Sequence, residues 1–347
     1  MLTLRHTLVL GDREFTSHLV RLRCERAVAP GIGLLRARLP HVGDLPAAVG
    51  DDVRLDLDSG DPVAGAGPVF TGTVTALRPA AAGVEVVAGD VSWTLAQFRP
   101  ATSYEGQTAG GVIGALAADA GVSLGPVDDG PTLPAYVADG ATTGWEHIAR
   151  LAAWSGAPAV VDAGGTITVR ARDAASADVA LRWGREVLAV RATDAALPTS
   201  GVAAAGEGPG PADDHPGAFR FTATGAPPVP PVAVRYRPGL RATDVAGAAT
   251  TAWLTREATR RRPVELDATL LPGVGPGDVL EVQDAPVPLP LLEVRRVEHR
   301  VDRTGGRTRI VARAGADADL LGRLGDLLGS VLGDPAGALA GAVGGLL

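Results

Sequence analysis

Short runs in which apolar and polar residues alternate dominate the first hundred positions. Residues 52–58, DVRLDLD, place Val53, Leu55 and Leu57 on one side and charged residues on the other. Strict alternation is typical of a strand with one buried face. Similar runs occur at residues 3–10, 69–77 and 83–89, with Gly, Pro and Asp between them. Several short strands at this spacing favour a β-sandwich or a β-barrel.

The hydrophobic period changes to that of a helix between about residues 103 and 172. Residues 107–122 and 142–156 each carry apolar residues at helical spacing. In the second segment Thr143 can cap the helix, and Glu146 can complete a capping box. Residues 157–172 then predict two strands around a glycine-rich turn. The region therefore predicts a small α+β domain.

The second half of the chain returns to β-structure after an irregular stretch. Residues 196–231 are rich in Pro, Gly and Ala, and predict a long exposed loop with one strand near 219–222. A helix is predicted near residues 244–262. Alternating runs then return at residues 263–270, 277–284, 290–301 and 307–314. They predict a second β-domain.

Residues 315–347 form an apolar tail with a helical pattern. Five residues fall on one face of this helix: Leu320, Leu324, Leu327, Leu328 and Val331. The stripe is too apolar for an isolated surface helix, and the glycines of the segment weaken such a helix further. We therefore expect this face to bind a partner. Asp334 and Pro335 interrupt the run of about 20 apolar residues that a membrane span needs, so membrane insertion is not expected.

A weak internal repeat links the two predicted β-domains. Residues 49–60 and 275–286 each contain a Gly-Asp turn that leads into an alternating strand. In each half a pair of strands follows after a loop of variable length, and we align Asp52 with Asp278. A duplicated β-domain and two unrelated hairpins both remain open, because the identity is low and such turns are common.

Charge and cysteine content narrow the range of partners. The chain of 347 residues has a formal net charge of −7 and contains no lysine. This balance gives no reason to expect nucleic acid or an anionic membrane as a partner. The only cysteine, Cys24, excludes an intramolecular disulfide and is expected to be a half-buried core residue of a strand.

No motif for catalysis or cofactor binding stands out in the sequence. There is no HExxH, GxSxG or Walker-type segment. Asp213, Asp214 and His215 are adjacent and could touch a cation or serve a hydrolase, but Pro and Gly surround them and no rigid frame is predicted. We expect His147 to lie at the surface or half-buried and His299 to be a packing residue. We therefore expect no catalytic residue, metal or cofactor, and no enzymatic activity.

Four segments, in order along residues 1–314, resemble the hub proteins of contractile tails. They are FTGTVTALRP at 70–79, the stretch from Gly89 to Val122, TTGWEHIARLAAWSGAPAVVDAGGTITVR at 142–170, and LLPGVGPGDVLEV with LLEVRRVEHRV at 270–301. Together they are similar to the phage late control protein D family and to the hub portion of VgrG-type proteins. Each segment alone is a weak signal, whereas four in the right order are fairly specific.

The resemblance implies a mainly β chain with four parts. These are a first tail-tube-like β-barrel at 1–102, a small α+β domain at 103–185, a second barrel at 186–314 that contains the loop 196–231 and the helix near 244–262, and the apolar tail at 315–347. The domain boundary is expected near Pro100. In this scheme Trp93, Leu95 and Phe98 form the last strand and apolar seal of the first barrel.

The resemblance also implies a structural function in a baseplate. Three chains would form a pseudo-sixfold ring that joins a sixfold tail tube to a threefold spike, and no catalytic residues are carried over. The expected partners are two further copies of the chain, a tube protein, a separate spike protein, and a tape-measure protein or cargo. We expect assembly in the cytoplasm and incorporation into a phage virion or an injection particle. An alternative class is a cell-envelope module that binds glycans, although no export signal is predicted and only 4% of the residues are aromatic.

Overall fold

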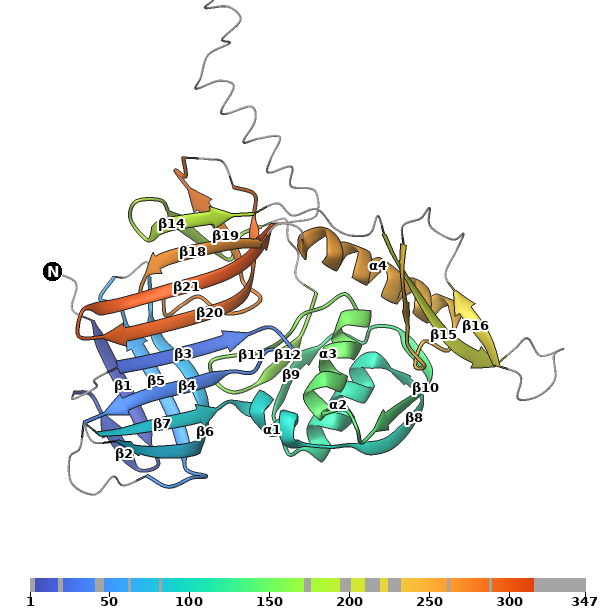
Figure 1. The fold of residues 1–347 in the computed structure, drawn as a ribbon, viewed down its shortest axis with the longest axis horizontal. Helices are drawn as coiled ribbons and strands as arrows, with labels where there is room; N and C mark the ends of the chain where they lie inside the picture. The colour runs from blue at the N-terminus through green and yellow to red at the C-terminus, as the bar shows by residue number, and fades with distance from the viewer. Residues whose placement is uncertain are drawn as a thin grey trace, which may run out of the picture.

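The structure is a computed structural model in which the chain divides into β-rich and helical regions (Figure 1). It describes residues 4–17, 21–40, 47–61, 64–80, 83–171, 176–193, 201–209, 219–223, 232–260, 263–286 and 289–314. Strands predominate in these ranges, as the sequence predicts. The segments of the tail face and of Asp213, Asp214 and His215 lie outside the described residues.

An N-terminal β-unit contains the first seven strands. They are β1 (Arg5–Leu10), β2 (Arg13–Phe15), β3 (Arg21–Ala27), β4 (Leu34–Leu39), β5 (Asp52–Asp58), β6 (Ala66–Ala80) and β7 (Gly83–Gly89). The sheet folds over on itself, so that β1 and β5 lie behind β3 and β4 in Figure 1. Val53, Leu55 and Leu57 are at most 1% exposed in the enclosed core, which confirms the alternation predicted for β5.

A C-terminal β-unit repeats this organisation with six strands. They are β13 (Val179–Arg182), β14 (Val187–Ala192), β18 (Pro263–Thr269), β19 (Val279–Gln283), β20 (Leu292–Asp302) and β21 (Gly305–Ala314). Its core is a separate apolar cluster, built mainly from β18, β20 and β21. Strand β20 also pairs with β3 of the N-terminal β-unit. That pairing joins both units in one thirteen-stranded sheet.

The two β-units share one strand order. The N-terminal order β3-β4-β7-β6-β5-β1 corresponds to β14-β18-β21-β20-β19-β13 in the C-terminal unit. Each order contains a bulge at the same place, between Val74 and Ala76 in β6 and between Val294 and Arg296 in β20. One difference is that β1 runs antiparallel to β5, whereas β13 runs parallel to β19.

The Gly-Asp turns that suggested a repeat are equivalent down to their hydrogen bonds. The Asp51 carboxylate accepts from the Ala48 N–H at 2.7 Å, and the Asp278 carboxylate accepts from the Gly275 N–H at 2.7 Å. Both turns place a glycine at positive φ, +101° at Gly50 and +88° at Gly277. The structure thus equates Asp51 with Asp278, one residue away from the alignment of Asp52 that the sequence suggests. Of the two alternatives, it favours duplication.

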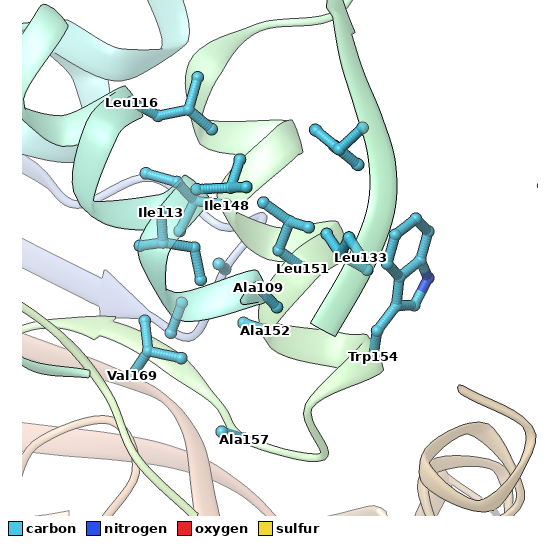
Figure 2. Packing of buried hydrophobic residues seen from close by; sticks show 14 of the residues in the cluster. Ala109, Ile113, Leu116, Leu133, Ile148, Leu151, Ala152, Trp154, Ala157 and Val169 are labelled. Carbon is cyan, nitrogen blue, oxygen red and sulfur yellow. The ribbon is translucent and has the colours of Figure 1, made fainter. Parts of the chain in front are cut away.

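A central α+β unit lies beside both β-units (Figure 1). Its elements are α1 (Val91–Gln97), β8 (Ala101–Thr108), α2 (Ala109–Asp119), β9 (Leu124–Val127), β10 (Thr132–Asp139), α3 (Gly144–Trp154), β11 (Ala159–Val161) and β12 (Ile167–Val169). Helix α3 has the predicted capping box between Thr143 and Glu146. Figure 2 shows α2 and α3 packing through Ile113, Ile148 and Leu151, each 0% exposed.

The segment after β7 differs from the expected terminal strand. Asp90 directly follows β7, and its carboxylate accepts from the Ser92 N–H at 2.9 Å, which caps the short helix α1. Leu95 and Phe98 then pack against the central core rather than closing the N-terminal β-unit. The expected strand is absent because the carboxylate of Asp90 caps the following residues as the start of a helix.

The expectation for residues 196–231 is only partly met in their described part: a strand at Phe219–Ala223 confirms the strand predicted near 219–222, whereas Gly201–Pro209 form a strand where a loop was expected. This part contains β15 (Gly201–Pro209) and β16 (Phe219–Ala223), which form a sheet with β17 (Val232–Tyr236). Helix α4 (Thr243–Arg260) packs on β15 and α3. Val245, Ala249 and Trp253 of α4 join the core of the central unit, so this helix does not belong to the core of the C-terminal β-unit.

Burial of His299 predicts that acid destabilises the fold. Burial lowers the pKa of His299 from 6.5 to about 3, so below pH 6.5 the unfolded chain binds a proton that the folded chain does not. Stability is therefore full above about pH 6.5 and declines as the pH falls toward 3. Between pH 8 and pH 5 we expect a loss of about 2 kcal/mol from this group. Urea unfolding at both pH values measures it.

The His299→Gln variant separates this effect from other titrations. Glutamine carries no charge at either pH, so the variant should lose about 2 kcal/mol less than the wild-type chain on acidification. The pKa values of His6 and His147, which burial also lowers, contribute equally in both proteins. An unchanged pH dependence in the variant would contradict the assignment.

Candidate assembly interface

The pairing of β20 with β3, called the seam below, carries an ion network on one face. Glu298 of β20 is 2% exposed and pairs with Arg23 of β3. Arg300 donates to Glu298 at 2.5 and 3.1 Å, and Arg296 reaches Glu25 at 3.3 Å. Burial raises the pKa of the Glu298 carboxyl, but the Arg300 hydrogen bonds and the neighbouring arginine charges outweigh burial and hold the pKa below its ordinary value.

The opposite face of the seam is a buried layer in which Cys24 and His299 are paired positions. Cys24 is 0% exposed and its thiol pKa is raised to about 12 by burial, so the thiol is unreactive. Nδ1 of His299 lies 3.0 Å from the Thr308 hydroxyl, which accepts from the Leu271 N–H at 2.8 Å. The structure thus confirms His299 as a packing residue and buries Cys24 more deeply than expected.

The strand correspondence locates two surfaces equivalent to the two sides of the seam. Strand β14 corresponds to β3, and residues 76–80 of β6 correspond to the part of β20 that pairs with β3. Within the described chain, the outer edge of β14 and the edge of residues 76–80 opposite β7 have no partner strand. The molecule therefore carries two complementary strand edges at different places.

Both edges expose side chains. Leu188 of β14 is 42% exposed, and the Arg191 side chain is 76% exposed. On β6, Arg78 and Pro79 are exposed. Open edges of this kind are templates for pairing with another chain.

His147 is fully buried, rather than at the surface or half-buried as expected from the sequence. It lies on α3 at 0% exposure, and Nδ1 is 2.7 Å from the Tyr136 hydroxyl. Burial raises the pKa of Tyr136 to about 12 and lowers the pKa of His147. Both groups are therefore neutral at pH 7 and hold α3 against β10. The sequence could have signalled this, because His147 is adjacent to the predicted apolar stripe.

The described ranges show neither a metal-binding cluster nor a membrane-spanning helix. They contain no group of three or more His, Cys, Asp or Glu residues that could hold a metal ion. No helix in these ranges is both long and apolar enough to cross a membrane.

Comparisons with known proteins add evidence on the fold. No protein-family model and no curated protein sequence matches the chain. Among solved structures, the 43 kDa tail protein of prophage MuSo2 from Shewanella oneidensis superposes with a TM-score of 0.67 at 14% identity, covering 90% of this chain and 99% of that one. A tail protein from Neisseria meningitidis gives 0.66 at 14% identity, covering 90% and 96%. This chain has the fold of phage tail proteins.

A third similar structure extends the likeness beyond phages. The E. coli c3393 protein is described as a component of the type VI secretion system with structural similarity to the T4 tail proteins gp27 and gp5. It superposes with a TM-score of 0.61 at 10% identity, covering 88% of this chain and 76% of that one. The likeness to hub and VgrG-type proteins that the sequence motifs suggest is thus confirmed at the level of the fold.

Removing the buried charge of Glu298 tests the seam. Glu298→Gln leaves Arg23 and Arg300 without their shared carboxylate, and we expect a loss of roughly 2 kcal/mol, less than for a fully buried pair because both arginines are half-exposed. The matched control is Glu85→Gln, which breaks an exposed pair with Arg78 and should cost under about 1 kcal/mol. Denaturant unfolding measures both, and equal losses would contradict a special role of the seam.

Proposed function

We propose that the chain is a structural baseplate hub of a phage tail or contractile injection system. The observation that carries the proposal is the pair of similar β-units joined edge to edge in one chain, on a fold similar to tail proteins. In the proposal, three chains form a pseudo-sixfold ring of β-units between a sixfold tube and a threefold spike. The chain acts by assembly and not by catalysis.

The ring closes if neighbouring chains pair through their open strand edges in the same way that β20 pairs with β3 within one chain. Strand β14 of one chain then takes the place of β3, and residues 76–80 of β6 in the next chain take the place of the second half of β20. Because the two edges differ, the contact is head to tail, and such contacts form a ring when the rotation closes. The outer edge of β14 and the edge of residues 76–80 are thereby covered by neighbouring chains.

The register of the new contact follows from the seam. Glu298 pairs with Glu25 and His299 pairs with Cys24 in the seam. The bulge and strand pairing that the two units share make Arg78 and Pro79 of β6 equivalent to Glu298 and His299. In the same way, Thr193 and Ala192 at the end of β14 are equivalent to Glu25 and Cys24. Arg78 of one chain is therefore expected to lie opposite Thr193 of the next.

Cysteine cross-linking tests the ring and its register together. Arg78→Cys combined with Thr193→Cys should give disulfide-linked species that end at three chains on non-reducing gels. The native Cys24 does not interfere, because burial raises its pKa to about 12. Sedimentation of the wild-type chain at micromolar concentration should show a trimer. A stable monomer would refute the hub proposal.

The control variants keep one cysteine and move the other. Ala66→Cys with Thr193→Cys places the first thiol at the end of β6 that pairs with β5, so it should not link chains. If the chain forms a trimer but the Arg78→Cys and Thr193→Cys thiols do not form a disulfide, the hub proposal stands and the proposed edge pairing is refuted.

A further inference from the structure

A cleft of about 610 Å³ lies where the central unit, α4 and the C-terminal β-unit meet. One wall is the C-terminal half of α3 with the loop that follows it, and the facing wall is α4. The ends of β20 and β21 form the floor at Glu293, Arg295 and Arg313. The cleft is distinct from the strand edges described above, and the inference below does not depend on the ring.

Small apolar side chains line both helical walls. Ala149, Ala152 and Ala153 face the cleft from α3, and Ala248 and Ala252 face it from α4. Ala157 and Trp154, which follow or end α3, also line the cleft, and Figure 2 labels both beside Ala152. Two helices that present alanines to the same space leave room for large apolar side chains from a third element.

Strand β21 ends at this cleft, and the C-terminal tail follows it in the sequence. Arg313, the second-to-last residue of β21, lines it, and residues 315–347 follow directly. A segment that starts beside a cleft docks there with a small loss of chain entropy, because the loop to be closed is short. The large side chains that the alanine walls lack occur in the tail at Leu320, Leu324, Leu327, Leu328 and Val331.

The charges of tail and cleft are complementary. The cleft is lined by three arginines and one glutamate: Arg256, Arg295, Arg313 and Glu293. Arg295 donates to Glu293 at 2.7 Å, so these two charges offset each other and the lining has a net charge of +2. The tail up to Pro335 contains four aspartates and one arginine: Asp317, Asp319, Asp326, Asp334 and Arg323. Complementary charges of this kind favour one orientation of docking over others.

We propose that the apolar face of residues 320–331 docks as a helix into the cleft between α3 and α4 of the same chain. The leucines fill the space between the two alanine walls, and the aspartates lie toward the arginines. The tail then fixes the central unit, α4 and the C-terminal β-unit relative to one another. It does so before any spike or tube protein arrives.

Thiol labelling of the full-length chain tests the docking. Ala248→Cys places a thiol on the α4 wall, where residue 248 is exposed among the described residues. With an intact tail the thiol should react with a maleimide at least about ten times more slowly than in the same protein carrying Leu324→Asp and Leu328→Asp, which corresponds to 1.4 kcal/mol. Equal rates would overturn the proposal.

A matched control separates docking from a general change of the helix. Leu254→Cys lies on α4, is 43% exposed and does not line the cleft. Its labelling rate should be the same with either tail. If the tail substitutions accelerate Leu254→Cys as much as Ala248→Cys, they loosen α4 as a whole, and the docking proposal falls.

Disulfide formation identifies which chain supplies the tail. Ala248→Cys is combined in turn with Leu320→Cys, Leu324→Cys and Leu328→Cys in the full-length protein. At least one pair should form a disulfide within a single chain under mild oxidation. Disulfides that link two chains, or none in any pair, would overturn docking in the same chain.

Discussion

The pairing of β20 with β3 is the interaction on which the rest of the structure depends. It makes one sheet of two β-units whose apolar cores are otherwise separate. The loop that leaves β3 then binds the other parts in turn. The Val28 N–H donates to the Arg295 carbonyl and the Ala29 N–H donates to the Ala159 carbonyl, both at 2.9 Å, and the Trp145 indole donates to the Gly31 carbonyl at 2.9 Å. One turn of chain thus ties both β-units and α3 together.

The sequence predicts most of the strands and helices that have a clear alternating pattern or a helix cap. Val53, Leu55 and Leu57 alternate and are buried, and the capping box at Thr143 and Glu146 begins α3 as expected. These predictions succeed because a strand with one solvent-exposed face shows alternating residues, and a helix start shows a polar cap, in the sequence of the segment itself.

The predictions failed where a segment consists mainly of small residues, because it then has no alternation of large apolar and polar side chains. Strand β15 reads GVAAAGEGP, a composition that is equally typical of a loop, and its pairing with β16 and β17 and its contacts with α4 make it a strand. The open edges of β14 and β6 were also beyond the sequence, because an edge is defined by which strand is absent. The turn of Asp51 was placed one residue away because two adjacent aspartates fit the same motif.

Divergence between the two β-units makes the seam and its proposed counterpart unequal. Where β20 has Glu298 and His299, β6 has Arg78 and Pro79. The proposed contact between chains would therefore lack the buried carboxylate that three arginines surround in the seam. Proline also removes one donor from the ladder, and it is a residue that proteins use to keep an exposed edge from pairing indiscriminately. The seam should consequently form first, during folding of each chain, and the weaker edges should pair afterwards, between chains that have already folded.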